Sequence, residues 1–224
     1  CVNIAAILPM VPIEPNLFEG AHIQYKSYNG WTFAFKDYIE AGIMQQFDDD
    51  TTAKMLNFLD PLNYKDRLAK IPKYIVLSSD DEFMMFDWTN HYYDQFKELG
   101  ETHLIISPNS EHSLATAIPN VLSSAGVLIR SIASGKTSED RPTFDYFKNE
   151  DDEKSITVTI PEQYQSMVKS VSLRHAETFS SKIRDFRWVT LASEDNKNCS
   201  LPWIRVPKDQ EDDLKAKHGL LESD

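Results

Sequence analysis

Cysteine and positive charge are both scarce in this sequence of 224 residues. The two cysteines, Cys1 and Cys199, are too few for a disulfide scaffold and do not form a zinc-binding pattern. Lysine and arginine total 23 against 35 aspartates and glutamates, which gives a formal net charge of −12. No basic stripe interleaved with aromatic residues offsets this charge, so we expect no nucleic-acid partner.

Long apolar runs are missing as well. No window of about 18 apolar residues exists, so no membrane span is expected. A signal peptide is not visible, but the chain opens with Cys1 rather than Met, and "CVNIAAILPMVP" is typical of a buried strand already inside a domain. We therefore expect that an N-terminal portion is missing. The 41% of hydrophobic residues is enough for one sizeable core and a small second domain.

The first 140 residues alternate strand and helix patterns, which predicts an α/β core with a largely parallel sheet. The apolar run at 4–13 is typical of a strand covered on both faces. Strands are predicted at 73–79 and 102–108, with a helix between them that ends at Gly100. A further helix is predicted over 113–134, with Pro119 near its first turns.

Residues 14–70 differ in character and predict a helical insertion into this core. Apolar residues recur at helical spacing between Phe35 and Phe47. A second helix is expected after the acidic run 48–50. A third is expected to open at Asp60-Pro61, with the aspartate as the cap and the proline in the first helical position.

The pattern turns to strands from about Arg141. Alternating apolar residues in "SITVTI", "KSVSLRH" and "RDFRWVTLA" predict a small antiparallel β domain over 141–206. The charge-dense residues 207–224 predict a weak helix or a frayed tail. Asn198-Cys199-Ser200 is a formal glycosylation sequon, a faint indication of the secretory route.

Ionisable residues follow both predicted parallel strands at their carboxyl ends, where the loops of such sheets converge. Asp80, Asp81 and Glu82 follow the first strand, and His112 follows the second. An acid followed by a histidine is the order found in α/β-hydrolases after the serine nucleophile. A solvated acidic turn and a hydrogen-bonded loop histidine are the alternatives. A metal site is the least favoured interpretation, because no calcium-loop pattern is present.

Several stretches together resemble the PhoPQ-activated pathogenicity-related protein family, which includes a secreted growth regulator. They are "AAILPMV", "YNGWTFAFKDY", "LDPLNYKDRL", "IPKYIVLSSDDEFMMFDW", "LIISPNSEHSLA" and "IRDFRW". The resemblance implies the C-terminal half of an α/β-hydrolase-like sheet with a helical insertion, followed by a small antiparallel β domain. It also implies that Asp81 is the orienting acid and His112 the base, with Asp80 standing where the family usually has glycine.

The nucleophile is the main departure from the family's plan. None of the serines present, including Ser78, Ser79 and Ser113, lies in a G-x-S-x-G context. The resemblance implies that the serine lies upstream of Cys1, so that this chain alone is inactive. If the triad interpretation is right, Asp81 and His112 lie within hydrogen-bonding range. Asp80 is then expected to cap the helix at Asp87 or to accept backbone hydrogen bonds near its start, and Glu82 is expected to face solvent.

Two functions of different classes follow from these observations. One is a secreted serine hydrolase or peptidase without a cofactor, acting on a small ester or peptide, with residues 14–70 as a lid. The other is a non-catalytic secreted signalling protein that binds a cell-surface receptor. Five aromatic residues are candidates for an apolar substrate pocket, although packing between insertion and core is the simpler explanation for each of them: Trp31, Phe33, Phe35, Phe86 and Trp88.

Overall fold

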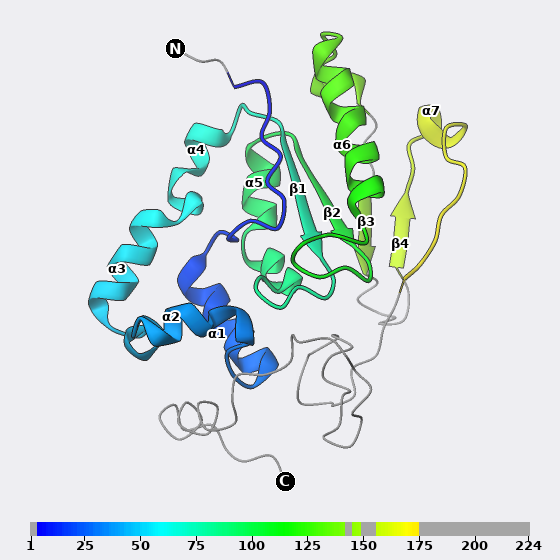
Figure 1. Cartoon of the computed structure of the whole chain (residues 1–224). Helices are drawn as coiled ribbons and strands as arrows, with labels where there is room; N and C mark the ends of the chain where they lie inside the picture. The colour runs from blue at the N-terminus through cyan, green and yellow to red at the C-terminus, as the bar shows by residue number, and fades with distance from the viewer. Residues whose placement is uncertain (1–3, 142–144, 149–155, 175–224) are drawn as a thin grey trace, which may run out of the picture. The chain divides into compact units, whose positions relative to one another are not determined.

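The computed structural model describes residues 4–141, 145–148 and 156–174 (Figure 1). These residues divide into two compact units, one ending at Ser123 and one beginning at Ser124. The elements of the described chain, in order, are α1 (Leu17–Tyr28), η1 (Phe33–Phe35), α2 (Lys36–Glu40), η2 (Met44–Gln46), α3 (Asp50–Leu59), η3 (Pro61–Tyr64), α4 (Lys65–Leu68), β1 (Lys73–Ser78), η4 (Phe86–His91), α5 (Tyr93–Leu99), β2 (Thr102–Ser107), α6 (Ile118–Ala133), η5 (Ser138–Asp140), β3 (Asp145–Lys148), β4 (Ile156–Thr159) and α7 (Glu162–Gln165).

A small parallel sheet organises the first unit, as the sequence predicts. β1 and β2 pair in parallel, from Lys73 opposite Thr102 to Ser78 opposite Ser107. All six residues of β1 are buried, which agrees with the apolar run at 74–77 in its middle. Because the two strands end in register, the loops that follow them start side by side.

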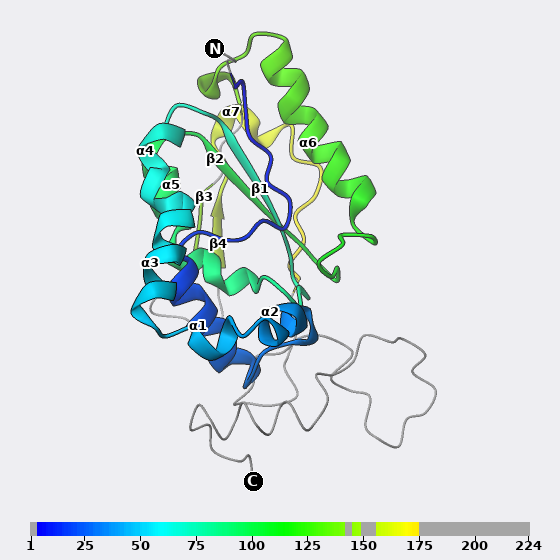
Figure 2. The ribbon, with the colours of Figure 1, turned by 60° about the vertical axis from the view of Figure 1, so that its left-hand side comes forward.

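The N-terminal segment runs along the other edge of β1, but it forms less of a strand than its sequence predicts (Figure 2). Among the described residues of this segment, Ile7 and Met10 alone make parallel bridges to β1. The prolines at 9 and 12 have no N–H to donate to a ladder, and Val11 has a positive φ of 41°. The prediction of a strand buried on both faces is therefore wrong for this segment, whose Ile4 and Ile13 are more than half exposed.

Residues 14–70 are largely helical, as predicted, although the helices differ in detail from the prediction. We call residues 14–70 the insertion, and their placement as an insertion into the core stays a prediction. α1 was not predicted; it lies between Asn16 and Asn29, two asparagines in the left-handed conformation that this residue tolerates. The helical pattern over 35–47 is broken into three short pieces, and Gly42 has a φ of 76° between them. The helix after the acidic run is present as α3.

Asp60 has the predicted capping role and a second one. Its side chain accepts a hydrogen bond from the N–H of Leu62 at 2.8 Å, and Pro61 occupies the first helical position of η3. The same carboxylate accepts from the N–H groups of Asn16 and Leu17 at 3.0 Å each. Asp60 therefore ties the start of α1 to the start of η3.

The core of the first unit is formed by aromatic and aliphatic side chains from the insertion, from β1 and from the segment after it. Its buried members are Leu17, Ala21, Tyr25, Trp31, Phe35, Ile39, Met44, Phe47, Ile75, Leu77, Met84, Trp88, Tyr92 and Phe96.

The segments on either side of β2 agree with the prediction in outline. The helix before β2 is divided into η4 and α5, and α5 ends at Gly100 as predicted. The helix after β2 begins later than predicted, at Ile118, with Pro119 in its first turn. No described helix combines the length and the apolar character that crossing a membrane requires.

In the second unit, β3 and β4 pair antiparallel, from Asp145 opposite Thr159 to Lys148 opposite Ile156. The predicted strand in "KSVSLRH" is wrong for the residues described, because 169–174 form no strand and Val171 and Leu173 are exposed. The predicted strand at 184–192, the sequon at Asn198 and the tail at 207–224 lie outside the described residues. The domain boundaries at 140 and 206 stay predictions.

We expect Gly20→Ala to lower the free energy of unfolding by about 1–3 kcal/mol or more, because an added methyl group overpacks the core. A Cβ at position 20 would lie 1.5 Å from the ring of Trp88, which the surrounding core holds in place. Gly126→Ala in α6 is the matched control, because its Cβ would meet only the flexible end of Arg130. Denaturant titration of both variants measures the difference, and equal stability would contradict the close packing of α1 on Trp88.

We expect Glu14 to make the stability of the first unit depend on pH. Its carboxyl group is fully buried, and neither oxygen has a well-aligned hydrogen bond to the described residues. Burial raises the pKa of Glu14 well above its usual range, the adjacent Tyr92 hydroxyl opposes this shift, and the charges of Asp81 and Asp87 add to it. The folded state therefore binds the proton of Glu14 more tightly than the unfolded state does.

We expect this contribution to be fully present below the ordinary pKa of glutamate and to be lost as the pH rises toward the raised value. Glu14→Gln keeps a neutral side chain of similar size, so its melting temperature should fall less than that of the native protein between pH 5 and pH 8. Glu19→Gln is the control, because Glu19 is exposed on the same segment. If the melting temperatures of the native protein and of Glu14→Gln fell equally between pH 5 and pH 8, the result would contradict a buried neutral carboxyl group at position 14.

Candidate active site

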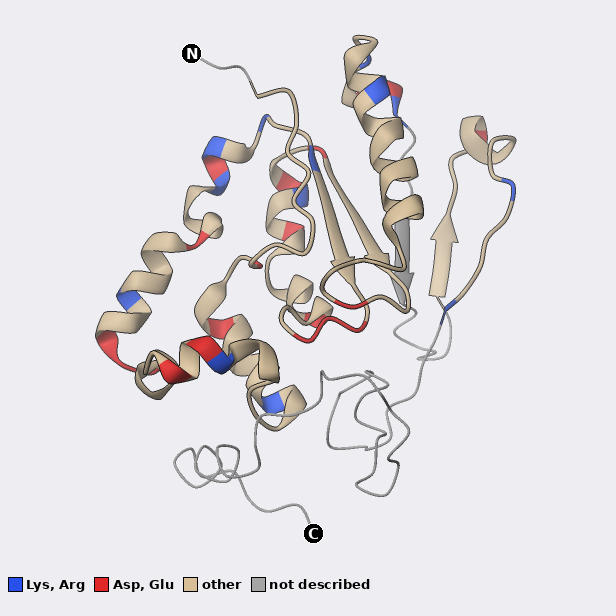
Figure 3. Ribbon diagram, in the orientation of Figure 1, with Lys and Arg blue, Asp and Glu red and all other residues tan. Residues whose placement is uncertain are grey.

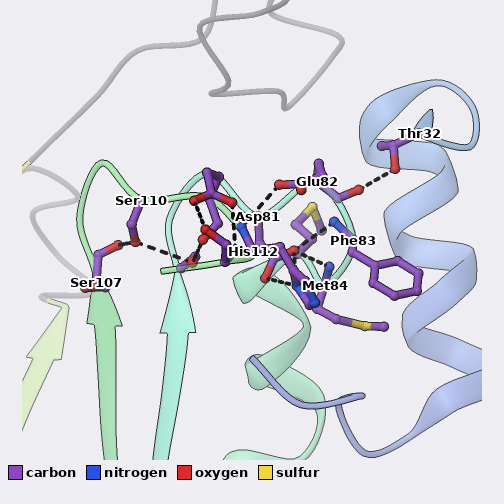
Figure 4. Close-up of polar contacts among 12 residues, drawn as sticks. Thr32, Asp81, Glu82, Phe83, Met84, Ser107, Ser110 and His112 are labelled. Carbon is purple, nitrogen blue, oxygen red and sulfur yellow. Dashed lines mark hydrogen bonds and ion pairs between the residues drawn. The ribbon is translucent and has the colours of Figure 1, made fainter. Parts of the chain in front are cut away.

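The candidate site lies at the carboxyl ends of β1 and β2, where two loops are joined by hydrogen bonds. The N–H of Ser79 donates to the carbonyl of Ser107, and the N–H of Asp80 donates to the carbonyl of Ser110, both at 3.0 Å. The hydroxyl of Ser78 donates to the carbonyl of Glu111 at 2.7 Å. These hydrogen bonds hold the loops after β1 and β2 side by side, so that residues 80–82 lie close to residues 110–112 (Figure 4).

Asp81 and His112 are in hydrogen-bonding contact, as the sequence predicts. The Nδ1 atom of His112 lies 3.1 and 3.0 Å from the two carboxylate oxygens of Asp81. The Asp81 side chain is fully buried, and its Oδ1 also accepts from the N–H groups of Phe83 and Met84 at 2.8 and 2.7 Å. The contact is therefore confirmed, and the catalytic roles of the two residues stay predictions.

This geometry assigns different roles to the two nitrogens of the His112 ring. A carboxylate that faces Nδ1 favours the proton on that atom, which leaves Nε2 able to accept another proton. Nε2 forms no hydrogen bond with the residues that the structure describes, and the His112 side chain is 33% exposed. The ring can therefore offer a basic nitrogen to a group outside these residues.

The surroundings of His112 favour its charged form. The hydrogen bond to Asp81 raises the pKa of His112, partial burial opposes that rise, and the negative charges of Asp81, Glu82 and Glu111 add to it. Figure 3 shows acidic residues in these two loops. The acid that orients the ring thus also stabilises the imidazolium that forms when Nε2 takes a proton.

The two other acids behave differently from their predictions. Glu82 was expected to face solvent, but it is half-buried and its Oε2 accepts a hydrogen bond from the backbone N–H of His112 at 3.2 Å. Asp80 was expected to cap the helix at Asp87 or to accept backbone hydrogen bonds near its start; the capping alternative is wrong, because the N-cap residue of η4 is Met85 and no side chain caps it. Asp80 instead accepts from the hydroxyl of Ser79 at 3.0 Å.

Of the five aromatic pocket candidates, Trp31, Phe35 and Trp88 are buried in the core, whereas Phe33 and Phe86 are half-buried. Packing accounts for the three buried rings, and a substrate-lining role for the five stays a prediction. The ring of Phe83 packs against His112, with ring centroids 5.3 Å apart. Phe83 was not among the residues predicted from the sequence, although its place two residues after Asp81 was a usable signal.

The described residues contain no group of three or more histidine, cysteine, aspartate or glutamate side chains arranged to hold a metal ion. The acids at 80–82 are instead engaged with backbone N–H groups, with the Ser79 hydroxyl and with His112. These acids therefore belong to the loop framework and to an acid–histidine pair.

An α/β protein with an acid–histidine pair at the ends of two parallel strands is the class that the fold and the site define. Residues 2–187 match the model of the PhoPQ-activated pathogenicity-related protein family, so the chain belongs to this family. It is similar to autocrine proliferation repressor protein A of Dictyostelium discoideum, with 33% identity over 191 residues. These residues are 84% of this chain and 38% of that protein, so the chain spans well under half of the curated relative's length. No solved structure matches the chain.

We expect Asp81→Asn to lower the pKa of His112. Asparagine keeps the oxygen that accepts from Phe83 and Met84, but it removes the charge that faces Nδ1. The titration of the His112 ring protons, followed by NMR, measures the change. Glu82→Gln should move the midpoint less, because Asp81 makes the largest contribution. An unchanged midpoint in Asp81→Asn would mean that the pair does not form in solution.

Proposed function

We propose that the full-length protein is a secreted serine hydrolase or peptidase with an α/β-hydrolase-like sheet, and that Asp81 and His112 are its acid and base. The observation that carries this proposal is the buried Asp81 carboxylate, which contacts Nδ1 of a half-buried histidine at the ends of two parallel strands. The nucleophile would come from sequence that precedes Cys1. The substrate class is a small ester or peptide.

In this mechanism the serine oxygen forms a bond to the carbonyl carbon of the substrate while its proton moves to Nε2 of His112. Collapse of the tetrahedral intermediate breaks the bond to the alcohol or amine, which takes the proton from Nε2. Water then repeats the sequence, and the acid product is released with the serine regenerated. Asp81 holds the ring in the required tautomer throughout and stabilises its positive charge.

A fluorophosphonate probe on the full-length protein tests the proposal, because the serine oxygen displaces fluoride only when a base removes its proton. We expect labelling of the native protein and a rate lower by roughly 10²–10⁴ in His112→Ala. His103→Ala is a matched control: the Nε2 of His103 lies 2.7 Å from a Glu101 oxygen, and its side chain is 31% exposed, but it lies near the other end of β2. Undiminished labelling of His112→Ala, or an unlabelled native protein, would refute the hydrolase proposal.

The second candidate is a non-catalytic secreted signalling protein that acts by binding a cell-surface receptor. The name of the Dictyostelium relative, an autocrine proliferation repressor, favours it. Secretion is part of both proposals, and glycosylation at Asn198 would accompany it. An effect on cell proliferation that survives His112→Ala, together with no labelling by the probe, would favour this candidate.

A further inference from the structure

The loop that carries Asp81 receives a ladder of hydrogen bonds from the helical insertion. The hydroxyl of Tyr28 donates to the carbonyl of Asp81 at 3.0 Å, and the side-chain amide of Gln24 donates to the carbonyl of Phe83 at 2.9 Å. Between them, the hydroxyl of Thr32 donates to the carbonyl of Glu82 (Figure 4). Three consecutive carbonyls are thus held by three side chains spaced four residues apart.

The spacing has a simple structural origin. Gln24 and Tyr28 lie one turn apart on the same face of α1, and Thr32 follows in the turn after the helix. Gln24 and Thr32 are buried, at 1% and 6% exposed, so their hydrogen bonds have little competition from water. The Oε1 of Gln24 also lies 3.4 Å from the N–H of Met85, which fixes the end of the same loop.

The other side of the loop is held by the residues of the candidate site. The carboxylate of Asp81 accepts from Phe83 and Met84 within the loop, and the carboxylate of Glu82 accepts from the N–H of His112. The insertion therefore holds the backbone carbonyls of residues 81–83. The loop that carries His112 contacts the side chains of Asp81 and Glu82. This backbone carries the carboxylate that orients the His112 ring.

Aromatic contacts join the same two parts of the first unit. The ring of Phe83 packs against His112, and its centroid lies 5.0 Å from that of Phe35 and 6.0 Å from that of Tyr38. Phe35 and Tyr38 belong to η1 and α2 in the insertion. A displacement of the insertion would therefore move both the loop backbone and the ring that packs on His112.

We propose that Gln24, Tyr28 and Thr32 are positioning residues for the Asp81–His112 pair, and that the insertion acts on the site as a clamp. Any effect on catalysis rests on the proposed hydrolase function, whereas the effect on the geometry of the pair does not. Small displacements of catalytic groups are costly, because the reacting atoms must be held in a near-attack arrangement. The insertion would then position the Asp81–His112 pair, a role that differs from the lid expected from the sequence.

The test removes single hydroxyl groups in the full-length protein and follows the titration of His112 by NMR. Tyr28→Phe and Thr32→Val should both move its midpoint to lower pH, because the Asp81 carboxylate is then held less firmly against Nδ1. Thr32→Ser, which keeps the hydroxyl, should restore the native midpoint. If the hydrolase proposal holds, fluorophosphonate labelling should also slow by on the order of tenfold or more in the first two variants.

Two controls remove equivalent hydrogen bonds elsewhere. Tyr64→Phe deletes a hydroxyl that donates to the carbonyl of Phe58 at 2.8 Å. Thr89→Val deletes a 7% exposed threonine hydroxyl that donates to the carbonyl of Phe86 at 2.7 Å. Both should leave the His112 titration and the labelling rate unchanged, which separates positioning from a general loss of stability.

The outcomes distinguish the clamp from the hydrolase. A shifted titration in Tyr28→Phe and Thr32→Val, in a protein that the probe does not label, supports the clamp and refutes the hydrolase. Native titration and native labelling rates in both variants overturn the clamp and leave the hydrolase standing. Should Thr32→Val fail to fold, Tyr28→Phe decides alone, because it removes one half-buried oxygen and keeps the ring.

Discussion

The buried carboxylate of Asp81 is the constraint on which the candidate site depends. A carboxylate removed from water is costly unless hydrogen-bond donors replace the lost hydration. Here the donors are two backbone N–H groups of its own loop and the ring of His112. The chain must therefore turn tightly after Asp81, and the loop that carries His112 must lie close to the Asp81 carboxylate. The geometry of the acid–histidine pair follows from satisfying this single group.

The parallel pairing of β1 and β2 makes that approach possible. Since Ser78 is opposite Ser107, the loops leave the sheet together, and backbone hydrogen bonds join them before they reach Asp81 and His112. A shift of register by even one residue would separate these partners and would turn the buried side chains of β1 to the other face. The burial of all six β1 residues thus fixes the register of the strand, and this register sets the positions of the two loops of the site.

The sequence predicted the parts of this arrangement that have local or periodic signals. The apolar run of β1, the capped start of η3 at Asp60 and the acid-then-histidine order all have such signals. α1 was missed because its buried face includes Gln24, whose partners at 83 and 85 are about 60 residues away. The strand at 4–13 was overestimated, since hydrophobicity does not reveal that prolines prevent a full ladder. The apolar alternation at 171 and 173 failed for a related reason, because alternation does not supply a pairing partner.

Three contacts in the first unit hold α1 against the loop that carries Asp81. Asp60 binds the N–H groups at its start, the absence of a side chain at Gly20 lets it lie on Trp88, and Tyr28 bonds the loop from its last turn. The indole N–H of Trp88 donates to the carbonyl of Pro15, so Trp88 also contacts the segment just before α1. A helix fixed at its start, in its first turn at Gly20 and in its last turn can neither slide nor rotate freely. The free energy that packs the insertion therefore also holds Asp81 in place, so loosening either part should loosen the other.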